Sequence, residues 1–299
     1  MKVLSFISKK KASAVFSKLL LYFLLIGIGM VFLHPILYML DNSFKSVNDL
    51  VNPTIEWIPS KLYLDNYKVA AEVLDYFRTL LVTIAVVGTA TVFQTISCAL
   101  AGYSIARHDM PLKNLWLVLM ILSFLTPASI TLIPKYLMFN KYGLIGSPLS
   151  VLLPALLGQG INSAVFVLVF NQFFAGYPKS FDEAARLDGA SGIKIFFKVA
   201  LPVCVPAIIV SLLFSFVWFW NETYVSGLLF GNALRTLPMK LQSFVEEFGR
   251  SHASGSDNKI NESLQLAATV LVVSPLMLFY ISLQKYFIEG IEASGITGE

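Results

Sequence analysis

One short segment of this chain, 180–202, brings carboxylates, basic side chains and hydroxyls close together, and it reads SFDEAARLDGASGIKIFFKVALP. The segment is polar and carries charges of both signs, whereas long uncharged runs dominate the rest of the chain. Charges and hydrogen-bonding groups packed so closely between two apolar runs need a surface to dock against. The segment therefore indicates a polar hinge that contacts a partner.

Local spacing predicts how this hinge folds. Ser180 and Glu183 have the S-x-x-E spacing of a capping box, in which each side chain bonds the backbone of the other residue. Strong helix formers follow, and Gly189 stands where a left-handed C-cap would lie. Ser191 can cap a second short helix, 192–200. The pattern predicts a helix, a turn at a glycine and a second helix.

Sequence signatures of catalysis and metal binding are missing. The chain has no G-x-x-x-x-G-K-[ST] phosphate loop, so we expect no ATP hydrolysis by this chain and no cofactor in it. It has no H-E-x-x-H and no G-x-S-x-G motif. Its histidines, His34, His108 and His252, stand in different segments and do not make a metal site. We expect a protein that is not an enzyme.

Within the apolar runs, the polar side chains are amides and hydroxyls without charge. They either join helices by hydrogen bonds or line a path for a neutral, hydroxylated solute, and the sequence leaves both roles open. Near 218–222, the aromatic residues either belong to an interfacial belt or stack on a sugar ring. The candidate path residues are Gln94, Asn162, Ser215, Trp218, Trp220 and Asn221.

The overall composition is that of a membrane protein. Hydrophobic residues make up 56% of the chain and the mean hydropathy is +0.72. Only 13% of residues are charged, against about 25% in soluble domains. The net charge of +4 without a Lys/Arg block argues against nucleic acid as a partner. Cys98 and Cys204 lie in or beside apolar runs, and we interpret both as packing residues.

Six charge-free runs are long enough to cross the bilayer, which predicts an all-α membrane protein with six transmembrane helices. Pro127, Pro206 and Pro275 should kink their helices. The predicted parts are a cytoplasmic N-terminus 1–18, spans 19–40, about 77–106, 114–134, 150–174, 201–221 and 263–285, outer loops 41–76 and 222–262, the cytoplasmic loop 178–200 and a tail 289–299.

Basic residues set the expected orientation of the spans. The first run exceeds the length of a signal-peptide core and lacks a small-x-small cleavage site, so we interpret it as a retained span. Lysines before the first span place the N-terminus in the cytoplasm, and six spans return the C-terminus there. These lysines are Lys2, Lys9, Lys10, Lys11 and Lys18.

The hinge also carries a family resemblance. Glu183-Ala184-Ala185, Asp188-Gly189-Ala190 and Leu201-Pro202 resemble the EAA loop of membrane subunits of bacterial ABC importers. Further motifs resemble the carbohydrate-uptake branch, similar to the second membrane subunit of the maltose transporter. They are Ser43-Phe44-Lys45, Trp57-x-Pro59, Asn66-Tyr67, Gly102-Tyr103-Ser104-Ile105-Ala106-Arg107, Trp220-Asn221 and Phe287-Ile288-Glu289-Gly290-Ile291. Together they extend over almost the whole chain.

This resemblance implies a type I ABC importer permease, with a core at 77–288, in the bacterial cytoplasmic membrane. Two cytoplasmic ATPase subunits would bind ATP and Mg, and a second homologous permease and an extracytoplasmic solute-binding protein would complete the assembly. The ATPase-coupling residues would be Glu183, Ala184, Ala185, Arg186, Asp188, Gly189, Ala190, Ser191, Lys194 and Phe197.

The expected cargo is a sugar or oligosaccharide. Import of a polyamine, phosphate or peptide by the same architecture is an alternative, and a self-contained secondary transporter is a further one, disfavoured by the EAA-like loop and the uncharged spans. Segment 246–260 is extra relative to the family pattern, and we expect it to touch the binding protein or the solute entrance. Within it, 249–258 is rich in Ser, Gly and Asn, which predicts mobility or ordering by a partner.

Overall fold

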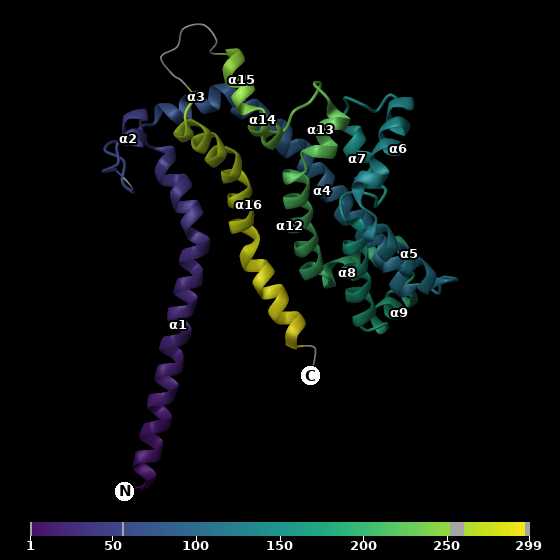
Figure 1. The fold of residues 1–299 in the computed structure, drawn as a ribbon. Helices are drawn as coiled ribbons and strands as arrows, with labels where there is room; N and C mark the ends of the chain where they lie inside the picture. The colour runs from purple at the N-terminus through teal and green to yellow at the C-terminus, as the bar shows by residue number, and fades with distance from the viewer. Residues whose placement is uncertain (1, 56, 252–259, 297–299) are drawn as a thin grey trace. The chain divides into compact units, whose positions relative to one another are not determined.

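A computed structural model describes residues 2–55, 57–251 and 260–296. Every regular element in these residues is helical (Figure 1). The all-α prediction is therefore confirmed for the part of the chain that the structure describes. Contacts divide the chain into two units, one made of Met1–Glu72 with Ser251–Leu271, the other of Val73–Arg250 with Val272–Glu299.

The first unit is built around α1 (Lys2–Ser43), whose apolar stretch Phe16–Ser43 is long enough to cross a membrane. Its hydrophobic side chains are exposed along this stretch, as expected of a helix that faces lipid. The short α2 (Val47–Val51) begins at a capping box between Ser46 and Asp49. After it comes α3 (Asp65–Leu74).

Buried polar contacts fasten the loop that follows α1. The amide of Asn66 donates to the carbonyl oxygens of Ser43 and Lys45 at 3.0 and 2.9 Å. The ammonium of Lys45 lies 2.9 Å from the carboxylate of Asp41. These bonds tie the end of α1 to the start of α3 and satisfy backbone groups that would otherwise be buried without partners.

At the centre of the second unit stands α4 (Tyr76–Arg107), which packs against α7 (Leu149–Leu156), α8 (Ser163–Gly176) and α12 (Val205–Asn221) (Figure 1). A Cβ at Gly102 would lie 2.6 Å from the Cβ of Phe170, so glycine is what lets α4 and α8 approach so closely. The core around this contact includes six aromatic residues and both cysteines, Cys98 and Cys204, which are buried as predicted for packing residues.

Several expected spans are broken rather than straight. The helix pair α5 (Lys113–Leu125) and α6 (Ala128–Lys141) bends by 94° at Pro127. The pair formed by Gly192–Val203 and Val205–Asn221 bends by 84° at Cys204, next to Pro206. In contrast, α16 (Glu262–Ile296) continues through Pro275. Proline thus coincides with two of the three expected kinks.

Among the described residues, three helices are long and apolar enough to cross a membrane, or up to five if each bent pair is one span. The three are Phe16–Ser43, Tyr76–Arg107 and Glu262–Tyr286. The region expected to form one span at 150–174 consists of α7 and α8 with a non-helical break between them. Pro154 lies in α7, and Gly158 in the break has φ +68°, which explains why no continuous helix forms there.

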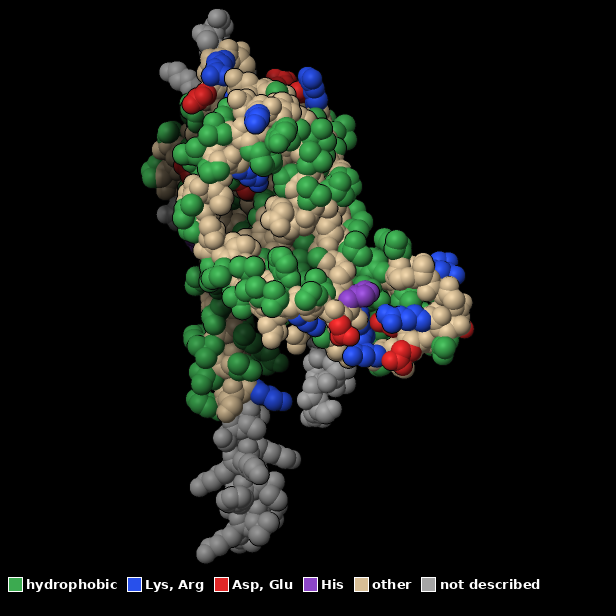
Figure 2. Space-filling view, turned by 90° about the vertical axis from the view of Figure 1, so that its right-hand side faces the viewer, with side chains coloured by type: hydrophobic (Ala, Val, Ile, Leu, Met, Phe, Trp, Pro, Cys, Tyr) green, Lys and Arg blue, Asp and Glu red, His purple; other side chains and the backbone are tan. Residues whose placement is uncertain are grey.

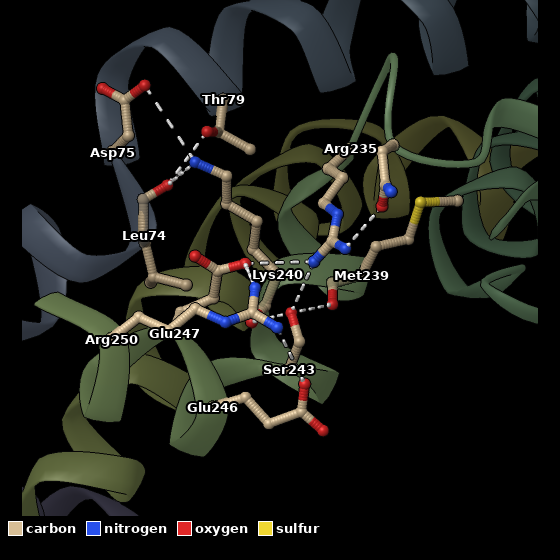
Figure 3. Close-up of polar contacts among 11 residues, drawn as sticks. Leu74, Asp75, Thr79, Arg235, Met239, Lys240, Ser243, Glu246, Glu247 and Arg250 are labelled. Atoms are coloured by element: carbon tan, nitrogen blue, oxygen red, sulfur yellow. Dashed lines mark hydrogen bonds and ion pairs between the residues drawn. The ribbon is translucent and has the colours of Figure 1, made fainter. Parts of the chain in front are cut away.

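The described part of segment 222–262, which we expect to be an outer loop, contains three short helices: α13 (Tyr224–Phe230), α14 (Leu237–Gln242) and α15 (Phe244–Ser251). Arg235, which precedes α14, bonds Ser243 at the end of that helix at 3.0 Å and Glu247 in α15 at 3.1 Å (Figure 3). Lys240 donates to the carbonyl of Leu74 at 2.9 Å, which fastens α14 to the residues before α4 (Figure 3).

The segment expected to be mobile, 249–258, is only partly described. Its first residues, up to Ser251, complete α15, and 252–259 lie outside the described residues. On the face drawn in Figure 2, hydrophobic side chains form broad continuous areas. Exposed apolar surface of this extent marks a membrane or protein contact.

Candidate functional site

The candidate site is the hinge that follows α8, and its first helix is α9 (Ser180–Leu187). The predicted capping box at Ser180 is wrong. The N-cap is Lys179, which has helical dihedral angles and makes no side-chain cap bond, so the Ser180 hydroxyl lies inside the first turn. The N–H of Glu183 bonds the carbonyl of Lys179 instead, at 3.1 Å.

The predicted turn at Gly189 is confirmed. This glycine has φ +75°, in the left-handed region. The N–H of Gly189 bonds the carbonyl of Arg186 and the N–H of Ala190 bonds the carbonyl of Ala185, both at 3.0 Å. This pair of bonds is the Schellman motif, which closes a helix by satisfying its last carbonyl groups.

The second helix also begins where the sequence predicts. The hydroxyl of Ser191 accepts a hydrogen bond from the N–H of Lys194, which caps α10 (Gly192–Ile195). A π-helical turn, η1 (Phe196–Ala200), and the short α11 (Leu201–Val203) follow. Ile195 and Phe196 are buried, and the ring of Phe196 lies 5.3 Å from that of Tyr103 on α4. The second helix is thus packed onto the core by its apolar side.

A charged residue at the end of α4 holds the first helix of the hinge. The guanidinium of Arg107 donates to the carbonyl of Tyr177 at 2.5 Å and stacks 3.7 Å from the centre of the Tyr177 ring. Its Nε lies 3.4 Å from a carboxylate oxygen of Asp182, at ion-pair distance. The Tyr177 hydroxyl donates to the other oxygen of Asp182.

This cluster of Arg107, Tyr177 and Asp182, here called the arginine clamp, is buried: the side chains of Arg107 and Asp182 are 2% and 7% exposed. Burial, and after it the hydrogen bond to Asp182, raises the pKa of the Tyr177 phenol. The hydroxyl therefore stays protonated and remains a donor to the carboxylate. Ion pairs and cation–π contacts are stronger when desolvated, as they are here.

Opposite the anchored side, the hinge presents an unpartnered face. Leu187 is 89% exposed and Ile193 is 72% exposed, although both are large apolar residues. Exposed charged residues, including Glu183 and Lys194, lie among them. None of the ten predicted ATPase-coupling residues is buried. A face of mixed apolar and charged side chains on a well-anchored element has the composition of a docking surface. This face is here called the docking face.

The structure brings two of the predicted path residues together. The amide of Gln94 donates to the hydroxyl of Ser215 and to the carbonyl of Ile161, both at 2.9 Å. Ser163 donates to the Gln94 carbonyl oxygen at 3.3 Å. Gln94 and Ser215 are completely buried. Their bonds, here called the glutamine network, join α4, α12 and the break before α8.

The other predicted path residues are dispersed. Trp218 packs its ring 5.1 Å from that of Phe166, and Trp220 is buried beside Phe216. Asn221 is exposed and donates to the carbonyl of Val217. Asn162 is exposed and has φ +52°, at the N-cap position of α8. The structure therefore does not gather all six residues into one site.

Sequence reasoning missed Arg107, Tyr177 and Asp182 as site residues. Arg107 closes the second charge-free run and Asp182 lies in the first turn of α9, so each has a local reason to be polar. Their pairing joins residues far apart in the chain and has no local sequence signal. The one available sign is that both charges border apolar runs, where an unpaired charge would be costly to bury.

Comparison with known proteins decides what this architecture is. Residues 98–292 match the family described as "Binding-protein-dependent transport system inner membrane component". The chain belongs to this family. The match includes both helices of the hinge, the end of α4 and most of α16. The protein is thus an inner-membrane component of a binding-protein-dependent transport system, as the EAA-like motif indicated.

Individual relatives cover nearly the full length of the chain. The polygalacturonan/rhamnogalacturonan transport system permease protein YtcP of Bacillus subtilis is 27% identical, over 94% of this chain and 98% of its own. The arabinooligosaccharides transport system permease protein AraQ of Halalkalibacterium halodurans is 28% identical, over 97% and 100%.

A solved structure gives the same fold. It is the crystal structure of a bacterial ABC transporter involved in the import of the acidic polysaccharide alginate, and the matched chain is 22% identical with a TM-score of 0.71. The match covers 90% of this chain and 95% of that chain. The fold is therefore that of an ABC importer permease.

Proposed function

We propose that this protein is the membrane-spanning permease subunit of an ATP-driven importer of sugars or oligosaccharides. The observation that carries the proposal is the hinge: a helix–turn–helix that is anchored to α4 on one side and presents apolar and charged side chains on the other. In a family of transport-system membrane components, such a face fits a cytoplasmic subunit that supplies energy.

The proposed membrane arrangement has six spans with both termini in the cytoplasm. The spans are α1, α4, the α5–α6 pair, the α7–α8 pair, the α11–α12 pair and α16. In this arrangement the break between α7 and α8 lies within the membrane. Non-helical backbone at that depth is tolerated where it is buried in protein or lines a water-filled cavity, and the glutamine network satisfies part of it.

The energy comes from outside this chain. Two cytoplasmic ATPase subunits bind ATP and Mg, and the hinge docks on them through Glu183, Leu187 and their neighbours. The chain itself holds no cofactor and catalyses no reaction, in line with the missing phosphate loop. A second, homologous permease and an extracytoplasmic solute-binding protein complete the importer.

The solute is proposed from the names of relatives. YtcP is named for transport of polygalacturonan/rhamnogalacturonan and AraQ for transport of arabinooligosaccharides, all of which are saccharides. Inside the second unit, the polar groups of α4 and α12 are amides and hydroxyls, among them Gln94, Thr95, Ser211 and Ser215. These side chains are buried and bond one another, so they join α4 to α12, and the sugar proposal rests on the relatives.

Two substitutions in the hinge test the coupling role. Glu183→Lys reverses a charge on the docking face, and Gly189→Asp adds a charged side chain at the turn. Both variants should insert normally into the membrane, lose solute uptake and co-purify less ATPase. Arg78→Gln is the matched control, because Arg78 is exposed and belongs to the opposite end of α4. Normal uptake by both hinge variants would refute the coupling role.

A reconstitution experiment tests the rest of the proposal. Proteoliposomes that contain the chain, its second permease, the ATPases and the binding protein should take up oligosaccharides in the presence of ATP. A panel with polyamine, phosphate and peptide solutes separates sugar import from the alternatives. Solute-dependent uptake by the purified chain alone would contradict the importer proposal and support a secondary transporter.

A further inference from the structure

The arginine clamp attaches α9 to the end of α4, and the proposed function leaves this attachment without a role. Three contacts of one guanidinium engage two points of the chain: the carbonyl and ring of Tyr177 just before α9, and the carboxylate of Asp182 in its first turn. We propose that Arg107 is a positioning residue that makes the hinge and α4 move as one body, a role that rests on the proposed function.

A second contact from the same helix face supports this inference. Tyr103 precedes Arg107 by four residues, so the two side chains leave the same side of α4. Arg107 holds the first helix of the hinge through Asp182, and Tyr103 holds the second through the ring of Phe196. The hinge is therefore fixed to α4 at one polar and one apolar point.

Attachment at two points restrains rotation as well as translation. With the apolar contact alone, α9 could pivot about the Phe196 ring. The clamp removes this freedom at the end of α9 that lies farthest from the Gly189 turn. A force applied to the docking face would then reach α4 directly, without passing first through the chain connections to α8 or α12.

The choice of side chain fits this role. A guanidinium is planar and offers donors in a fixed fork, so it can bond a carbonyl, approach a carboxylate and stack on a ring at once. A lysine carries the same charge but offers a single point of attachment. Burial of the clamp excludes water that would compete for these contacts. The Tyr177 hydroxyl adds a bond that orients the carboxylate of Asp182.

The test compares solute transport with ATP hydrolysis in the complete importer, reconstituted with its ATPases, second permease and binding protein. Arg107→Gln keeps a polar side chain but removes the charge and the fork. In this variant the amount of solute transported per ATP hydrolysed should fall by about tenfold, while the ATPase subunits remain bound. Arg107→Lys should recover part of the ratio, and the exposed control Arg78→Gln should keep it.

Each outcome decides between alternatives. If Arg107→Gln lowers transport and ATP hydrolysis in the same proportion, the residue is merely structural and the inference is overturned. If Arg107→Gln changes neither transport nor ATP hydrolysis, the inference is overturned too. Should Arg107→Gln fail to assemble, Tyr177→Phe removes only the hydroxyl, and its ratio should fall by a smaller factor. No fall in that variant again overturns the inference. If the wild-type importer transports nothing with ATP, the proposed function itself fails.

Discussion

Two buried polar attachments on one helix, the glutamine network and the arginine clamp, differ in charge. Gln94 and Arg107 belong to α4 and are about 20 Å apart along it, at 1.5 Å per residue. Gln94 joins α4 to α12 and the break before α8 with neutral bonds. Arg107 joins α4 to the hinge with an ion pair.

The difference follows from what surrounds each attachment. A charged side chain in the middle of a membrane span costs free energy. An amide such as that of Gln94 can hydrogen-bond neighbouring helices there without this cost. At the end of the helix the chain leaves the apolar region, and a buried charge needs only one good partner. We infer that α4 holds its neighbours neutrally within the membrane and ionically at the hinge. The following predictions test this contrast, beginning with the largest expected effect.

Breaking the clamp on one side should have the largest effect. Arg107→Ala leaves the buried carboxylate of Asp182 without its cation, which costs about 3–5 kcal/mol for a buried ion pair. The double variant Arg107→Met with Asp182→Leu removes both charges and should recover much of this loss. Thermal unfolding of the purified protein in detergent measures both. A double variant as unstable as the sum of the two single variants would contradict the ion-pair account.

Adding a charge to the glutamine network should have the next largest effect. Gln94→Glu places a carboxylate in the span, at a cost of about 2.5–3.5 kcal/mol for a charge at a helix centre. Gln94→Leu loses only neutral bonds, at about 1 kcal/mol. The same unfolding measurement distinguishes them. Equal stability of the two variants would show that the middle of α4 tolerates charge, and the contrast with the clamp would disappear.

The turn of the hinge should respond to backbone strain alone. A Cβ at Gly189 would meet no atom within 4 Å, but φ is +75°. Gly189→Val should therefore cost about 1–3 kcal/mol by strain, whereas Gly189→Asn should cost less because asparagine tolerates this region. Limited proteolysis of the hinge reports the difference. If the two variants are cleaved at the same rate, strain at the left-handed turn does not determine the stability of the hinge.

The smallest effect should come from the hydroxyl of Tyr177. Tyr177→Phe keeps the ring beneath Arg107 but loses the bond to the Asp182 carboxylate, at about 1.5 kcal/mol for a hydrogen bond to a charged group. Because the folded state raises the pKa of this phenol, the contribution is complete below its ordinary pKa of 10.0 and is lost as pH rises further. The stability difference between wild type and variant should thus be constant around neutral pH. A difference that already changes near pH 7 would contradict the assignment.

Sequence reasoning reached the all-helical fold and the hinge because both have local signals. Long charge-free runs mark membrane helices, and Gly189 and Ser191 mark the turn and the second cap. Hydropathy alone marks one apolar run around Pro127, but the proline predicted the kink, and the structure shows two helices that bend there by 94°. Ser180 looked like a cap, but the helix begins one residue earlier than that role requires.

Contacts between distant residues were beyond sequence reasoning. Asp182 lies in the hinge and Arg107 ends α4. No local sequence pattern around either residue predicts that the two side chains pair. For Gln94 and Ser215 the sequence left open a solute path or bonds between helices, and the structure shows the two side chains bonded to each other and buried. Tertiary packing decides whether a polar side chain in a span faces a path or a neighbouring helix. The spacing of residues along the chain does not predict that packing.

One distance measurement tests most directly whether the hinge and α4 move together. Spin labels at Leu100→Cys on α4 and Ser180→Cys on α9 would both be accessible, since Leu100 and Ser180 are exposed and neither is a predicted coupling residue, while Cys98 and Cys204 are buried. In the complete importer the distance between the labels should stay the same without nucleotide and with ATP bound, and should change with ATP in Arg107→Gln. A distance that changes with ATP in the wild type would contradict the account.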